Sequence, residues 1–223
     1  MTIRSALRVG TAAVLIAALA GCTSVFPGRG PPPALYDLSP KSTYDPDVPA
    51  VTAQLVVEVP VAADSLNTTR IAVRRRPLSI DYYQGVRWTE RAPVLVQTLL
   101  VESFENSQRI VAVARQSIDL RADYVLKTEL REFQAEYIGE AAPSVRVRLN
   151  AKLVRMPARI IVASRTFERR IAAPGRHIEK VVRAFDEALG KVLKATVEWT
   201  LRTMAALPPA PRAAGATIDS GGS

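Results

Sequence analysis

The stretch that decides the fold is Val145-Arg146-Val147-Arg148-Leu149-Asn150-Ala151-Lys152-Leu153. Apolar and polar residues alternate throughout it. Successive side chains of a β-strand point to opposite faces, so this period of two predicts a strand with one buried and one open face. Arg146, Arg148 and Lys152 are then expected in a row on the open face.

Outward from this strand, the chain alternates between strand and helix patterns. Met156-Pro157-Ala158 interrupts the strand, and the β-branched residues that follow predict an antiparallel partner. The predicted strands are 54–61, 69–74, 78–82, 110–114, 123–137, 145–153 and 160–171, and the predicted helices are 90–107 and 177–204. This order predicts an α+β fold, a single domain with a mainly antiparallel sheet and two helices packed on one face.

The charge of the chain is concentrated in one region. The formal net charge is +9, yet the segment 145–170 alone holds eight basic residues and one acid, Glu168. The chain has a single cysteine, Cys22, and a single histidine, His177. Zinc sites of the Cys/His type and internal disulfides are therefore excluded, and we expect no cofactor and no metal.

The N-terminus has the pattern of an export signal. Arg4 and Arg8 precede an apolar run at 11–20 that is about half of the roughly 20 residues needed to span a bilayer. Leu19-Ala20-Gly21-Cys22 matches the bacterial lipobox, in which the cysteine thiol is acylated. We expect residues 1–21 to be a signal peptide and Cys22 to be the lipidation site, with acyl chains such as palmitate. Thr23, rather than Asp, follows the cysteine, which favours the outer membrane by resemblance to enterobacterial lipoprotein sorting.

Proline-rich segments flank the predicted domain. Seven of the 28 residues from Thr23 to Ala50 are proline, which predicts an extended tether. Such a segment would reach about 85 Å when fully stretched. The tail 207–223 carries prolines followed by a Ser/Gly end and is expected to be disordered.

An ordered set of short segments resembles the ABC-type transport auxiliary lipoproteins. The set follows the lipobox and the proline-rich linker, and consists of Tyr36-Asp37-Leu38, Val59-Pro60-Val61, Thr69-Arg70-Ile71-Ala72-Val73, Arg87-Trp88-Thr89-Glu90 and Ala122-Asp123-Tyr124-Val125-Leu126. The similarity begins at Leu35, so we assign 22–34 to the lipidated N-terminus and tether, and 35–206 to the auxiliary lipoprotein domain. The basic run Arg74-Arg75-Arg76 and the proline-rich tail depart from the family pattern.

The resemblance implies a non-enzymatic lipoprotein that accompanies a mammalian-cell-entry (MCE) lipid transport system. Its expected partners are an MCE-domain protein, an ABC permease and an ATPase, with membrane lipids as cargo between the inner and outer membranes. We expect it to be lipid-anchored in the outer membrane, with its domain facing the periplasm. A homo-oligomer is compatible with this role. The alternative is a structural or assembly lipoprotein of another envelope system.

Two other function classes fit the sequence less well. A carboxylate-based glycan hydrolase needs two acids about 5–10 Å apart in a cleft. Glu129, Glu132 and Glu136 are the available acids, but Glu132 and Glu136 share one strand face, as solvated positions would. Nucleic-acid binding is suggested by the isoelectric point near 10.1. The export signal and the lack of aromatic stacking platforms argue against it.

The candidate binding residues are therefore Arg146, Arg148 and Lys152, because guanidinium groups suit lipid phosphates or an acidic partner protein. The competing interpretation is a solvated sheet face that discourages aggregation. Trp88 is expected in the core or at an interface, and His177 at the start of the last helix.

Overall fold

The computed structural model describes residues 31–115, 122–137, 139 and 142–208. The signal peptide, Cys22 and most of the tail lie outside these residues. From Ala34 onward the chain forms one compact α+β unit. Its elements are β1 (Ala34–Tyr36), β2 (Val51–Val57), β3 (Val61–Ala62), β4 (Arg70–Arg74), β5 (Asp81–Trp88), α2 (Ala92–Ser107), β6 (Ile110–Arg115), β7 (Tyr124–Glu136), β8 (Ser144–Arg155), β9 (Ile160–Ala172) and α3 (Ile178–Ala206).

Strand β7 is the spine of the sheet. One of its edges pairs with β8 along almost its whole length, and β8 pairs with β9, both antiparallel. Its other edge pairs in succession with β2, β3 and β4, all parallel. The long antiparallel ladders confirm the predicted hairpins, and the parallel pairs make the sheet mixed.

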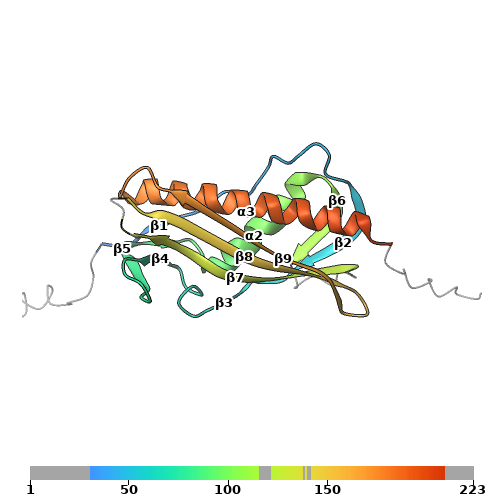
Figure 1. Cartoon of the computed structure of the whole chain (residues 1–223), viewed down its shortest axis with the longest axis horizontal. Helices are drawn as coiled ribbons and strands as arrows, with labels where there is room; N and C mark the ends of the chain where they lie inside the picture. Colours follow the sequence, from blue (N-terminus) through green and yellow to red (C-terminus); the bar gives the residue numbers. More distant parts are fainter. Residues whose placement is uncertain (1–30, 116–121, 138, 140–141, 209–223) are drawn as a thin grey trace, which may run out of the picture. The chain divides into compact units, whose positions relative to one another are not determined.

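Both helices pack on one face of the sheet (Figure 1), as predicted. Trp88, Phe133 and Phe185 form the aromatic centre of the core, with ring centroids 5.1–5.7 Å apart. This confirms the core role of Trp88. His177 is the N-cap residue of α3, as expected, and its carbonyl accepts hydrogen bonds from the backbone N–H groups of Lys180 and Val181.

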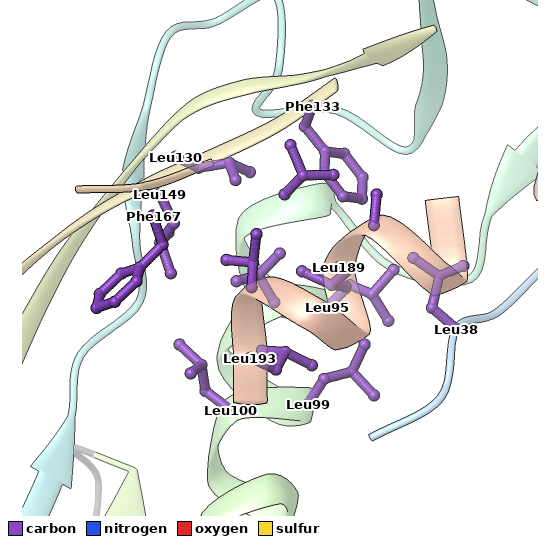
Figure 2. Close-up of a cluster of buried hydrophobic side chains, with 14 of the residues drawn as sticks. Leu38, Leu95, Leu99, Leu100, Leu130, Phe133, Leu149, Phe167, Leu189 and Leu193 are labelled. Carbon is purple, nitrogen blue, oxygen red and sulfur yellow. The ribbon is translucent and has the colours of Figure 1, made fainter. Parts of the chain in front are cut away.

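The tether prediction is wrong for residues 37–50, which we call the strap, because this segment packs against the domain. Leu38 and Val48 are buried in the main core, and Figure 2 shows Leu38 beside the leucines of the two helices. The backbone N–H groups of Ser39 and Asp45 donate to side-chain carboxylates of α3, those of Asp186 and Glu198, at 2.7 and 2.9 Å. This proline-rich segment therefore lies along α3 and is not a free spacer.

Further contacts fix the direction of the strap. Just before its start, the hydroxyl of Tyr36, the last residue of β1, donates to Glu179 near the beginning of α3, at 3.4 Å. At its end, Arg202 near the end of α3 forms an ion pair with Asp47 at 2.9 Å. The strap therefore runs in the same direction as α3, from its N-terminal end to its C-terminal end.

Two strand predictions need correction. The run predicted as one strand, 54–61, is two strands, β2 and β3, because Pro60 has no N–H to continue the ladder. The strand predicted at 78–82 begins only at Asp81, because Leu78 has a left-handed backbone (φ 62°) and belongs to a turn.

Candidate functional site: the open face of the sheet

The predicted alternation in β8 is confirmed. Val145, Val147 and Leu149 are at most 1% exposed in the core beneath α3. Arg146 and Arg148 point to the face of the sheet that the helices leave open, and their side chains are only 23% and 36% exposed. What partly covers these two arginines is a set of acids from the neighbouring strands.

Those acids are placed by a β-bulge in β7. Leu126, Thr128 and Leu130 face the core, but the register with β8 then shifts between Leu130 and Glu132. The extra residue, Arg131, reverses the alternation, so that Phe133 and Ala135 return to the core. Glu132, Gln134 and Glu136 consequently face the open side, alongside Arg146 and Arg148.

Glu136 is the centre of this network, although we predicted it to be solvated. Its side chain is 1% exposed, so that prediction is wrong. Three arginines from three strands surround its carboxylate: Arg74 of β4 at 3.3 Å, Arg146 of β8 at 4.0 Å, and Arg170 of β9, which donates to Oε2. The Gln134 amide adds a hydrogen bond at 3.0 Å. A buried carboxylate is tolerated because this many donors replace its lost hydration.

Glu168 of β9 is a second acid in the network. The Arg146 Nε donates to Glu168 Oε1 at 2.8 Å, and the Arg148 Nε lies 3.5 Å from Oε2. The hydrogen bond from Arg146 lowers the pKa of the Glu168 carboxyl, with the charges of Arg146, Arg148 and Arg170 acting in the same direction. The same hydrogen bond raises the pKa of Arg146 above its ordinary value.

The strongly basic segment is therefore largely neutralised where Arg146 and Arg148 lie. Four arginines (Arg74, Arg146, Arg148, Arg170) and three acids (Glu132, Glu136, Glu168) share the network, which leaves one net positive charge. Counting charges along the sequence missed this, because two of the acids come from β7. The sequence does contain a sign of the bulge: in β7 the apolar residues of the main core fall on even positions up to Leu130 and on odd positions from Phe133 onward.

Lys152 lies apart from the two arginines. Its neighbours across the strands are Lys127 on β7 and Ser164 on β9. Lys127 forms an ion pair with Glu58 at 2.8 Å, whereas the described residues give Lys152 no ion pair. The structure thus brings Arg146 and Arg148 together but leaves Lys152 as an exposed cation on its own. A binding role for the three residues stays a prediction.

In the run Arg74-Arg75-Arg76, only the first residue joins the network of ion pairs. Strand β4 ends at Arg74, whose guanidinium belongs to the network. Arg75 and Arg76 lie in the turn that follows, where the Arg75 guanidinium is 5.8 Å from the centre of the Tyr83 ring. The three residues therefore do not form one patch.

Comparisons with known proteins identify the family of the chain. The family model for the ABC-type transport auxiliary lipoprotein component matches residues 35–197. The chain belongs to this family. The match runs from within β1 to within α3, and it confirms the resemblance stated from the sequence.

Individual proteins that are similar to this auxiliary lipoprotein are consistent with the family assignment. The crystal structure of a DUF330 protein from Xanthomonas campestris is 35% identical, with a TM-score of 0.74, and the alignment covers 77% of this chain and 97% of that one. An uncharacterized protein from Bradyrhizobium diazoefficiens is 30% identical over 192 residues, 82% of this chain and 49% of the relative. The chain therefore spans about half the length of that relative. A third, uncharacterized structure shares the fold at 16% identity and a TM-score of 0.59.

Family membership makes the chain a lipoprotein associated with ABC-type transport. No helix within the described part of the auxiliary lipoprotein is both long and apolar enough to cross a membrane. Cys22, the predicted acylation site, lies outside the described residues.

Proposed function

We propose that the chain is anchored in the outer membrane through acylated Cys22 and serves as a non-enzymatic accessory of an MCE-type lipid transport system. The observation that carries the proposal is the family match over residues 35–197, which begins shortly after a lipobox cysteine. In this role the folded domain docks to the transport proteins, and the acyl chains hold it at the membrane that receives or supplies lipid.

The length of the tether supports a position close to the membrane. Because the strap belongs to the domain, only residues 23–33 separate the acylated cysteine from β1. A chain of this length spans at most about 40 Å. This is less than half of the reach expected from the proline content alone, so the transport proteins would have to approach the membrane to meet the domain.

The state of the acids supports a non-enzymatic role. Glu129 bonds to Arg131 at 2.7 Å, and Glu132 and Glu136 are held by the arginine network. A carboxylate that is already paired with arginine is not free to act on a substrate. The pairs of Glu132 and Glu136 join different strands, so these residues support the stability of the sheet instead.

The proposal is tested by affinity purification of the detergent-solubilised native protein, with the accompanying chains identified by mass spectrometry. We expect an MCE-domain protein together with its permease and ATPase. The control is a Cys22→Ala variant, which should lose these partners if the anchor is required for assembly. Recovery of an outer-membrane assembly factor, with no transport protein, would contradict the transport role and favour the alternative lipoprotein class.

A further inference from the structure

The turn between β4 and β5 holds a leucine in an unusual position. In this turn, residues 75–80, the Ser79 N–H donates to the Arg76 carbonyl at 3.4 Å, Pro77 is second and Leu78 is third with φ 62°. Proline followed by a left-handed residue is the pattern of a type II turn, whose third position normally belongs to glycine or asparagine. A leucine there costs free energy, because its Cβ crowds the backbone.

The Leu78 side chain does not pack in the core. Its relative exposure is 104%, the highest of the exposed large hydrophobic residues in the described part of the chain. Strain at an exposed apolar side chain is a reason to look for a ligand, since the fold itself gains nothing from either feature.

The cations beside Leu78 form no ion pair within the part of the chain that the structure describes. Among the described residues, neither Arg75 nor Arg76 forms an ion pair, whereas Arg74 one position earlier is tied to Glu132 and Glu136. Arg75 stacks on Tyr83 and is thereby held near the turn. The turn therefore presents one exposed apolar side chain preceded by two exposed guanidinium groups.

The path of the chain places this turn on the side from which the tether arrives. Strand β1 is parallel to β5, with Ala34 opposite Val86, so the chain enters β1 from the side where β5 begins. That side is the β4–β5 turn. Figure 1 shows β4 and β5 together at one end of the sheet.

We propose that the β4–β5 turn is a membrane contact, in which Leu78 enters the interface of an anionic bilayer and Arg75 and Arg76 bind lipid phosphates. This inference rests on the proposed anchor at Cys22. One leucine and two arginines bind a bilayer weakly on their own, about fivefold per cation. Beside a short tether the membrane is present at high effective concentration, so a weak contact suffices to orient the domain.

The same chemistry occurs at the other end of the domain and supplies a control. At the β8–β9 tip, residues 156–161, Ile160 and Ile161 are 59% and 55% exposed beside exposed Arg159. This tip adjoins the C-terminal end of α3, because Arg155 donates to the Pro208 carbonyl. A helix of 29 residues is about 43 Å long, so the two tips are well separated.

The test uses the lipidated full chain in vesicles with a single added thiol. If Cys22 is acylated, Leu78→Cys or Ile161→Cys carries the only free thiol, and each takes one environment-sensitive fluorophore. In vesicles of phosphatidylglycerol and phosphatidylcholine we expect a blue shift and quenching by bilayer quenchers at position 78, and an aqueous spectrum at position 161. Pure phosphatidylcholine, high salt, or Arg75→Gln with Arg76→Gln should return position 78 to the aqueous spectrum.

Each other outcome overturns the inference in a distinct way. An aqueous spectrum at position 78 in anionic vesicles, with one fluorophore per chain, rejects the membrane contact and leaves the transport role intact. A shift at position 161 instead assigns the contact to the other tip. Two fluorophores per chain show that Cys22 is free, which removes the anchor and this inference together. Protection of position 78 only when transport proteins are added identifies a protein contact.

Discussion

Arg170 of β9 donates to the buried carboxylate of Glu136 on β7, reaching over the intervening strand β8. Together with Arg74 and Arg146, it ties the three strands β4, β8 and β9 to one carboxylate on β7. The open face of this sheet is thus held by charge, while the opposite face is held by apolar packing against the helices.

Removing the central charge should destabilise the domain. Breaking a buried ion pair by deleting one partner costs about 3–5 kcal/mol, because the remaining charge stays uncompensated. Since the arginines around Glu136 are partly exposed, we expect Glu136→Gln to lower the free energy of unfolding by about 3 kcal/mol. Urea denaturation measures this. The matched control is Glu129→Gln, whose exposed pair with Arg131 should contribute about 0–1 kcal/mol; equal effects would contradict the central role of Glu136.

Acid should weaken the network through Glu168. The pKa of Glu168 is lower in the folded state than its ordinary value of 4.5, chiefly because Arg146 donates to it. Its stabilising contribution is complete above pH 4.5 and is lost as the pH falls below that value towards the folded pKa. NMR titration of the Glu168 carboxyl in the wild type and in Arg146→Gln tests this. The variant should shift the carboxyl pKa upward, and an unchanged titration would reject Arg146 as the cause.

The strap should contribute to stability as a core element does. Leu38 is 7% exposed, and truncation of a buried leucine costs about 2–5 kcal/mol. We expect Leu38→Ala to lower the free energy of unfolding by about 2 kcal/mol, near the lower limit because the site is at the edge of the core. Leu35→Ala, at a position 64% exposed, is the control and should have little effect. If the segment were a free tether, the two variants would behave alike.

The strained turn predicts a substitution that stabilises the fold. Asparagine tolerates the left-handed conformation better than leucine, so Leu78→Asn should raise the free energy of unfolding by about 1 kcal/mol. Thermal unfolding measures the change as a higher Tm. Ile160→Asn, which replaces an exposed apolar residue in an ordinary strand, should give no such gain. A lower Tm for Leu78→Asn would show that the leucine supports the fold after all.

The anchor predicts a change in location. Cys22→Ala removes the thiol that would carry the acyl chains, so the protein should move from the membrane fraction to the periplasmic fraction. Fractionation with immunodetection measures the distribution. A Thr23→Ala variant serves as the control, because it alters the neighbouring residue and keeps the thiol. Continued membrane association of Cys22→Ala would reject the lipobox.

The sequence predicted the elements with strong periodicity. The alternation from Val145 to Leu153 and the apolar stripe of the last helix report burial directly, so β8 and α3 were found within a few residues of their bounds. Strand β1 was missed and β3 was not separated from β2, because three and two residues are too few to show a period. The parallel pairs were missed because they join segments that are distant in the chain.

The candidate site was predicted only in part. The direction of Arg146 and Arg148 follows from alternation in β8, but their neutralisation depends on the register with β7 and on the bulge at Arg131. Local patterns carry no information about cross-strand register. For the same reason, the burial of Glu136 could not be predicted: the residues that share its strand face, Glu132 and Gln134, are polar types that are usually exposed.

The parallel pairing of β1 with β5 also decides how the domain bears mechanical load. If Cys22 carries the proposed lipid anchor, a pull from it enters the sheet at Ala34, and a pull directed back past the start of β5 acts along the axis of β1. Hydrogen bonds loaded along the strand must break together by sliding, whereas a perpendicular pull would open them one at a time. Beyond β1, the strap fastened along α3 would take up the remaining force, so movement of the membrane would shift the whole domain before it unravelled its edge.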